Sequence, residues 1–326
     1  MNVRRRLIPA ALASALGLGA LTACSSDSAA TGNTDKFDVV ASFYPMAFLA
    51  EQIGGDHVNV TSLTEPGQEP HDLEISTQQR AQLEEADAAL FLKGLQPAVD
   101  EAVAQTGIKT KIDAATLTTL EDHGTGGHSH EGEEGHAEEG HAEEEGHAEE
   151  EEHARDPHIW LDPVKYAEVA EGVGKAFEKA DPDHAADYKK NTAALVGKLN
   201  DLNGTFENGL KNTKTKVFFT NHAAFGYLAE RYGLTQEAIS GLDPESEPSA
   251  ARVRELQEEA KADGVTTVFY ETLVSDKTAK TLARDANLKT DVLDPLEGIT
   301  DKSRGDDYFQ VMEANLKALQ KALGAK

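Results

Sequence analysis

The chain has 326 residues, a formal net charge of -27 at pH 7 and 39% hydrophobic residues. This length and composition are typical of a globular protein with one large domain or two lobes, and they exclude a disordered chain. The acidic balance argues against nucleic acid and anionic lipid headgroups as partners, because both require basic patches. A cation is the ligand that such a chain favours.

The first residues predict a secretory signal. Arginines at 4–6 precede a short apolar run at 7–21, and Leu-Thr-Ala-Cys then ends at Cys24. A charged start, a short apolar run and a small-residue cleavage site are typical of a signal peptide. The ending resembles a bacterial lipobox, so we expect 1–23 to be a lipoprotein signal peptide and Cys24 to be lipidated. A plain signal with an incidental cysteine is the alternative.

Cys24 is the only cysteine of the chain. No disulfide within the chain and no cysteine-based zinc site is therefore possible. The residues that follow it are mainly small and polar, which predicts a flexible tether over 24–36.

Short apolar runs with β propensity alternate with helical patterns along the rest of the chain. The expected strands are 38–44, 58–63, 88–92, 216–220, 266–270 and 290–293. The expected helices are 44–53, 78–86, 163–179, 223–232, 249–263, 277–287 and 308–323. This alternation predicts an α/β fold with parallel sheets and crossover helices. Ligand sites of such folds form at the carboxyl ends of the strands.

A histidine-rich acidic segment interrupts this pattern at 121–153. Its 33 residues include fourteen carboxylates, seven histidines and seven glycines. Because nothing in it can bury apolar surface, we expect a mobile, disordered insert. Its histidines are predicted to be accessory, weak metal ligands: His123, His128, His130, His136, His141, His147 and His153.

Leucine and phenylalanine recur in steps of three and four over 183–210, which predicts one long helix of about 40 Å at 1.5 Å per residue. We expect this helix to join an N-terminal lobe at 37–182 to a C-terminal lobe at 211–326. The alternative is two shorter helices that break near Asn203-Gly204.

Three histidines outside the insert are candidate ligands. His71 lies in a loop that two prolines and a glycine constrain, after the strand expected at 58–63. His158 lies in Asp156-Pro-His-Ile-Trp-Leu-Asp-Pro163, where Asp162 should cap a helix that begins at Pro163. His222 follows the strand expected at 216–220. A structural histidine is the alternative at each position.

Near His71, Glu69 and Asp72 are candidate partners of the imidazole. The two remaining histidines, His57 and His184, have polar contexts and are expected at the surface.

Two carboxylates in the last turn are candidate fourth ligands. Asp294 and Glu297 lie three residues apart after the last expected strand, although a solvated turn is the commoner outcome. Three imidazoles and one carboxylate suit zinc. If the protein fills all four positions, no place remains for a reacting water, and the site binds rather than catalyses. The alternative from another class is a secreted zinc hydrolase with Glu69 or Glu297 as general base.

Together these residues resemble the metal-binding lipoproteins of ABC transporters, specifically the zinc-uptake (ZnuA-like) substrate-binding proteins. The matching stretches run in family order along the chain. They are Ala41-Ser-Phe-Tyr-Pro45, Glu69-Pro-His71, Asp156-Pro-His-Ile-Trp-Leu-Asp-Pro163, Asn221-His-Ala-Ala-Phe-Gly-Tyr-Leu228, Ile239-Ser-Gly-Leu242, Glu247-Pro-Ser249 and Asp294-Pro-Leu-Glu297.

The resemblance implies two α/β lobes, each with a mainly parallel sheet flanked by helices, and one long rigid helix between them. It implies a metal in the cleft between the lobes, with His71 and His158 as ligands from the first lobe and His222 from the second. The Pro-Leu-Glu form resembles the subgroup that uses a glutamate, which ranks Glu297 above Asp294 as the fourth ligand. Manganese relatives usually have a glutamate in place of His222, so the three histidines favour zinc.

The implied function is zinc capture, not catalysis. The resemblance implies an extracytoplasmic lipoprotein, anchored to the membrane through Cys24, that delivers Zn²⁺ to an ABC permease driven by a cytosolic ATPase. We expect it to be a monomer. The alternative within the same fold is an importer of manganese or iron.

Overall fold

The structure is a computed structural model that describes residues 36–123 and 155–325. The expected signal peptide, Cys24 and almost all of the expected tether lie outside the described residues. Six of the seven histidines of the insert also lie outside them: His128, His130, His136, His141, His147 and His153. Within the described part of the chain, no helix combines the length and the apolar character needed to cross a membrane.

The first half of the fold is a parallel sheet of four strands in the order β2-β1-β3-β4. In its register Val39 lies opposite Val60 on one side and Ala88 on the other. The strands are β1 (Phe37–Ala41), β2 (Val58–Ser62), β3 (Ala88–Phe91) and β4 (Thr110–Asp113). The accompanying helices are α1 (Tyr44–Gly54), α2 (Thr77–Glu85) and α3 (Pro97–Gln105).

The second half repeats this architecture, with strand order β6-β5-β7-β8 and parallel pairing throughout. Its strands are β5 (Val217–Thr220), β6 (Thr235–Ala238), β7 (Thr267–Tyr270) and β8 (Lys289–Val292). Its helices are α6 (Gly226–Tyr232), α7 (Ala250–Ala262), α8 (Lys277–Asp285) and α9 (Tyr308–Leu323). The predicted α/β class with two parallel sheets is confirmed.

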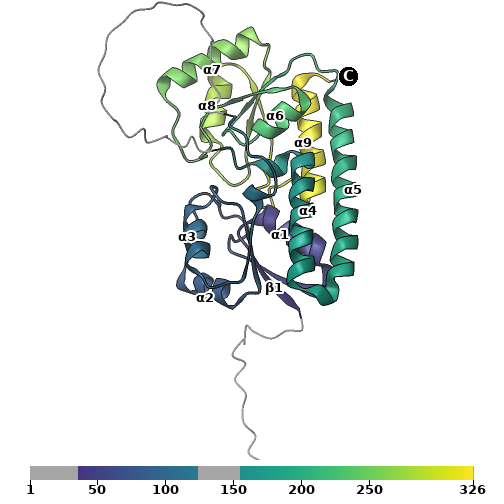
Figure 1. Cartoon of the computed structure of the whole chain (residues 1–326). Coiled ribbons are helices and arrows are strands. Elements are labelled where there is room, and N and C mark those ends of the chain that lie inside the picture. The colour runs from purple at the N-terminus through teal and green to yellow at the C-terminus, as the bar shows by residue number, and fades with distance from the viewer. Residues whose placement is uncertain (1–35, 124–154, 326) are drawn as a thin grey trace, which may run out of the picture. The chain divides into compact units, whose positions relative to one another are not determined.

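Two long helices stand between the sheets in the sequence. They are α4 (Pro163–Ala180) and α5 (Ala185–Leu210), and they run side by side in Figure 1. Asp162 caps α4 by accepting a hydrogen bond from the N–H of Val164, as the Asp-Pro sequence predicts. The helix α5 continues through Gly204 without a break, so the alternative of two shorter helices is wrong. Short 3-10 helices lie at η1 (Gly55–His57), η2 (Ala114–Thr116), η3 (Ile159–Leu161) and η4 (Pro182–His184).

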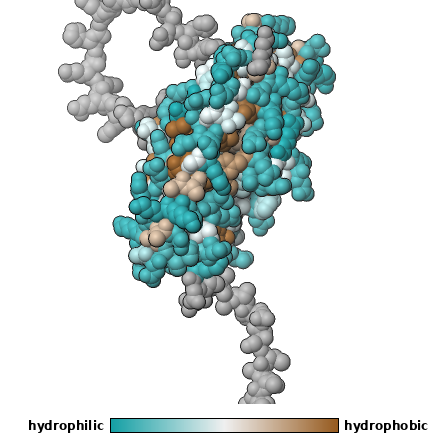
Figure 2. Space-filling model, turned by 90° about the vertical axis from the view of Figure 1, so that its right-hand side faces the viewer, coloured by the Kyte–Doolittle hydropathy of each residue, from teal (hydrophilic) through white to brown (hydrophobic). Residues whose placement is uncertain are grey.

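Trp160 connects the two halves of the fold. Its indole Nε1 donates a hydrogen bond of 2.7 Å to the carbonyl of Pro295, and the hydroxyl of Tyr308 donates one of 2.7 Å to the carbonyl of Trp160. The ring of Tyr308 also packs 5.4 Å from that of Phe48 in α1. One hydrophobic core therefore extends through both halves. The face on the side of α5 is mainly hydrophilic, with hydrophobic residues visible near its middle (Figure 2).

Some elements were not predicted. The strands β4 and β6 are edge strands of their sheets, and their sequences, Thr-Lys-Ile-Asp and Thr-Gln-Glu-Ala, carry little apolar pattern. The helix α3 also lacked a prediction. The first expected strand ends earlier than predicted, because Pro45 lies in the first turn of α1.

Candidate metal centre

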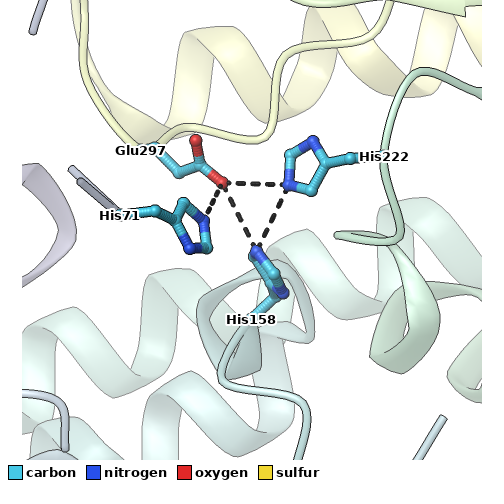
Figure 3. Close-up of side chains that lie close together, drawn as sticks. All are labelled: His71, His158, His222 and Glu297. Carbon is cyan, nitrogen blue, oxygen red and sulfur yellow. Dashed lines mark hydrogen bonds and ion pairs between the residues drawn. The ribbon is translucent and has the colours of Figure 1, made fainter. Parts of the chain in front are cut away.

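Four side chains from distant parts of the chain point toward one another in Figure 3. His71 lies in the segment between β2 and α2, and His158 lies directly before η3. His222 lies two residues after β5, and Glu297 lies in the segment between β8 and α9. Three of the four therefore come from segments that follow the carboxyl ends of parallel strands, where ligand sites of α/β folds form.

The distances within this group fit a shared ion. Oε1 of Glu297 lies 3.4 Å from Nε2 of His71, 3.4 Å from Nε2 of His158 and 3.2 Å from Nε2 of His222. The two nitrogens Nε2 of His158 and His222 are 3.4 Å apart. Ligand atoms placed tetrahedrally about 2.0–2.1 Å from a zinc ion are separated by about 3.3–3.4 Å. These four separations thus match a tetrahedral zinc site, and all the ligand atoms of the group lie within 4.8 Å of one another.

Two of the imidazoles are fixed by carboxylates on the side away from the group. Oδ1 of Asp156 lies 2.7 Å from Nδ1 of His158 and accepts the backbone N–H of the same histidine. Oε1 of Glu271 lies 2.6 Å from Nδ1 of His222 and accepts its backbone N–H as well. A carboxylate at Nδ1 fixes the tautomer that leaves Nε2 free to bind a metal. Both histidines are fully buried, so their rings have little freedom to turn.

His71 is the most accessible member of the group, with 11% of its side chain exposed. Its loop is held by Glu69, whose oxygens accept the backbone N–H groups of His71 and Asp72. Burial raises the pKa of Glu69 above its ordinary value. Glu69 thus supports the loop rather than the imidazole, and Asp72 is exposed.

Glu297 is fully buried, and its Oε2 finds no hydrogen-bond partner among the described residues. Such an oxygen is costly to bury unless a ligand satisfies it. Burial opposes its charge, but the charge of His222 and hydrogen bonds from the three imidazoles hold the pKa of Glu297 well below its ordinary value. Glu297 therefore presents an ionised carboxylate to the group.

Asp294, the alternative fourth ligand, is used in another way. Its Oδ1 accepts the N–H of Leu296, and its Oδ2 accepts the hydroxyls of Thr272 and Ser303. Leu296 has a left-handed φ of 59°, so these bonds hold a turn that ordinary side chains disfavour. Asp294 lies outside the group of four and shapes the turn that presents Glu297.

The electrostatics of the group favour a cation. For His222, burial lowers the pKa, but the charges of Glu271 and Glu297 raise it well above the ordinary value. For His158, burial also lowers the pKa, but hydrogen bonds to Asp156 and Glu297 outweigh it and raise the pKa above the ordinary value. Without a metal, protons on these imidazoles balance the negative charge of the buried carboxylates. A bound cation would take the place of those protons.

The remaining histidines have other surroundings. His57 and His184 stack with ring centres 4.1 Å apart, and each contacts an aspartate away from the group. They are partly exposed, with 30% and 33% of their side chains accessible.

His123 requires a correction, because it does not lie in a mobile insert. Its ring packs edge-on against Tyr227, with the ring centres 4.3 Å apart, and its Nδ1 lies 2.7 Å from Oδ2 of Asp156. The N–H of Glu121 donates to the hydroxyl of Tyr227, and the N–H of Asp156 donates to the carbonyl of Glu121. Composition alone placed 121–123 in the insert, but these contacts make them part of the folded body.

Sequence reasoning did not identify the roles of Asp156 and Glu271. Glu271 directly follows β7, and a carboxylate at the carboxyl end of a buried strand was the available signal. Asp156 was visible in its Asp-Pro-His sequence, but only the fold shows that its carboxylate contacts two histidines.

Comparisons with known proteins agree with this geometry. The profile of the family described as "Zinc-uptake complex component A periplasmic" matches residues 39–322. The zinc-binding lipoprotein AdcA of Streptococcus pneumoniae is 38% identical over 310 residues, which cover 92% of this chain and 58% of that protein. The chain thus spans little more than half the length of this relative. The high-affinity zinc uptake system protein ZnuA of Bacillus subtilis is 35% identical, covering 95% of this chain and 98% of that protein.

The solved structure of the Zn(II)-bound ZnuA-like domain of S. pneumoniae AdcA has the same fold, with a TM-score of 0.70 and 34% identity. The match covers 88% of this chain and 99% of that domain. The profile match extends from β1 to α9 and includes all four residues of the group. The chain belongs to the family of the zinc-uptake complex component A.

Proposed function

We propose that this protein is the extracytoplasmic zinc-binding component of an ABC importer. His71, His158, His222 and Glu297 capture one Zn²⁺ ion as cargo, and the protein passes it to a membrane permease driven by a cytosolic ATPase. The observation that carries this proposal is the convergence of three Nε2 atoms and one carboxylate oxygen within 4.8 Å of one another. The four distances of 3.2–3.4 Å among them match a tetrahedral zinc site.

The donor set favours zinc over manganese or iron. Three imidazole nitrogens and one carboxylate form a borderline-soft set, whereas manganese prefers more oxygen ligands. The names of the relatives from S. pneumoniae and B. subtilis also refer to zinc. No specific contact in the described residues favours manganese.

The same geometry supports binding rather than hydrolysis. Four protein ligands complete a tetrahedral zinc shell, and a hydrolase needs an open position for the reacting water. The two candidate general bases are also engaged: Glu69 accepts backbone N–H groups through both oxygens, and Glu297 lies within the group itself.

We further propose that lipidation of Cys24 anchors the protein outside the cytoplasm. The support is the sequence Leu-Thr-Ala-Cys after a short apolar run, together with the word lipoprotein in the name of the S. pneumoniae relative. Mass spectrometry of the protein from its native membrane tests this. A mature chain that begins with diacylated Cys24 is the expected result, and an unmodified cysteine would contradict it.

Zinc affinity tests the main proposal. Competition with a chromophoric chelator should give one tight site in the full chain, and the His71→Ala, His222→Ala double variant should bind more than about 100-fold more weakly. The matched control is His57→Ala with His184→Ala, which also removes two imidazoles, but outside the group. Equal affinities of both double variants would reject the site, and stronger binding of Mn²⁺ than of Zn²⁺ would reject the cargo.

A further inference from the structure

A second cluster of ligand-type side chains lies where the described chain stops before the histidine-rich segment. Glu121, His123 and Glu230 each offer one ligand atom, and these atoms lie within 4.8 Å of one another. Nε2 of His123 lies 2.9 Å from Oε2 of Glu230. None of these three residues belongs to the group of His71, His158, His222 and Glu297.

His123 is oriented in the way that a metal ligand is. Oδ2 of Asp156 fixes its Nδ1 at 2.7 Å, while Oδ1 of the same carboxylate fixes Nδ1 of His158 at 2.7 Å. Asp156 is 1% exposed, so this partner is as rigid for His123 as it is for His158. A buried carboxylate at Nδ1 turns Nε2 away from Asp156 and toward Glu230, and a carboxylate at the second ring nitrogen is the arrangement found at histidine ligands of metals.

The chain also makes room for the ring of His123. A Cβ at Gly226 would lie 2.5–2.7 Å from Cγ, Cβ and Nδ1 of His123, so only glycine fits at this position of α6. A pocket opens beside the ring and is also lined by Glu230, Leu234 and Gln236. The imidazole is therefore packed on one side and reaches open space on the other.

We propose that Glu121, His123 and Glu230 form a second binding site for a divalent cation of the zinc class. One imidazole nitrogen and two carboxylate oxygens suit a borderline ion. The nearby ammonium of Lys165, 2.6 Å from Oε1 of Glu121, offsets only one of the two carboxylates. An ion replaces the direct contact between His123 and Glu230 and is bound by both.

This site binds its ion more weakly, and exchanges it faster, than the group of His71, His158, His222 and Glu297, which is called the transport group below. Glu230 is 60% exposed and Glu121 is 36% exposed, whereas His158, His222 and Glu297 are fully buried. Three ligands also leave at least one position of a zinc shell to water. The site therefore accepts ions directly from solvent and holds them beside the carboxylate that orients His158.

Crystals of the full chain grown with several equivalents of ZnCl₂, measured at the zinc absorption edge, test this site. The expected result is an anomalous peak about 2.0–2.2 Å from Nε2 of His123 and from an oxygen of Glu230. In Glu230→Gln this peak should disappear while the peak at the transport group remains. The matched control is the exposed Glu258→Gln, which should keep both peaks.

A second variant changes no ligand. Gly226→Ala pushes the ring of His123 away from its position and should also remove the second peak, while Gly197→Ala in α5, where a Cβ meets nothing within 4 Å, should retain it.

Three results would overturn the second site: no peak at the cluster in the wild type, a peak that survives in Glu230→Gln, or a peak shared with a neighbouring molecule in the crystal. The absence of a peak at the transport group would instead reject the proposed function, so the two failures are distinguishable.

Discussion

The carboxylate of Asp156 lies 2.7 Å from Nδ1 of His158, and the same oxygen accepts the backbone N–H of that histidine. These two contacts fix both the position and the tautomer of an imidazole that the sequence pattern identified only by its neighbours. Glu271 makes the same pair of contacts with His222. Two histidines of the candidate centre therefore share one arrangement, in which a buried carboxylate orients the imidazole so that it binds through Nε2.

Asp156→Asn should weaken zinc binding by roughly 10–100-fold, the usual effect of losing such a partner. The amide keeps the shape of the side chain but loses the charge that stabilises the bound imidazole. Chelator competition measures the change. The matched control is Asp187→Asn, which alters an aspartate 2.9 Å from Nε2 of His57 and should leave the affinity unchanged. Equal affinities of the two variants would refute the role of Asp156.

Glu297 and Asp294 should respond differently to substitution. Glu297→Gln should lose most of the zinc affinity, because it removes the only carboxylate of the described group. Asp294→Ala should lower the free energy of unfolding by about 1–3 kcal/mol, because it leaves the N–H of Leu296 and the hydroxyls of Thr272 and Ser303 without their acceptor.

Urea unfolding of the metal-free proteins and chelator competition separate these effects. If Glu297→Gln retained full affinity and Asp294→Ala lost it without destabilisation, the two assignments would have to be exchanged.

Zinc affinity should fall as the pH decreases. In the metal-free protein, burial lowers the pKa of His158 and His222, but the neighbouring carboxylates outweigh it and raise the pKa values. A raised pKa means that protons persist above about pH 6.5, the ordinary pKa of histidine, and zinc must displace them. The decrease in affinity should therefore begin above about pH 6.5.

The stability of the metal-free protein has the opposite pH dependence to the zinc affinity, because protonation of the histidines is linked to folding. The stabilisation from a raised histidine pKa is fully present below the unfolded pKa and is lost as the pH rises through the folded pKa. The rise in Tm on adding zinc should therefore grow with pH. From about pH 5.5 to 8.5, titration calorimetry measures the zinc affinity and scanning calorimetry measures the rise in Tm on adding zinc. An affinity that stays constant across this range would contradict the prediction.

Trp160→Phe should destabilise the protein by about 1–3 kcal/mol, because it leaves the buried carbonyl of Pro295 without its donor at 2.7 Å. This bond connects η3 to the turn that carries Glu297. Urea unfolding measures the change, and an unaltered slope of the transition would show that the unfolded ensemble is the same. An unchanged midpoint would mean that the bond contributes nothing.

Strong periodicity made much of the fold predictable. The leucines of α5 have the period of a helix, and the short apolar runs of β1, β3 and β5 are typical of buried strands. The edge strands β4 and β6 lack such a pattern, because an edge strand is partly covered by neighbours and tolerates polar residues. Their position in the sheet is decided by tertiary pairing, which composition does not reveal.

The four ligands of the candidate centre were predictable from the sequence, but the carboxylates that orient two of them were not. His71, His158, His222 and Glu297 were identified through resemblance, since each motif alone also suited a structural role. The contacts of Asp156 with His123 and of Glu271 with His222 join residues 33 and 49 positions apart, so no local pattern could show them. Asp156 and His158 are only two positions apart, but their spacing alone does not show that the carboxylate reaches Nδ1. His123 was misplaced because composition assigns a boundary by residue type, whereas its packing against Tyr227 depends on the fold.

Diffraction at the zinc absorption edge from the full chain with one equivalent of zinc shows directly where the ion binds. We expect one dominant anomalous peak, about 2.0–2.2 Å from Nε2 of His71, His158 and His222 and from a carboxylate oxygen of Glu297. A dominant peak elsewhere, with these four side chains still in contact only with one another, would contradict it.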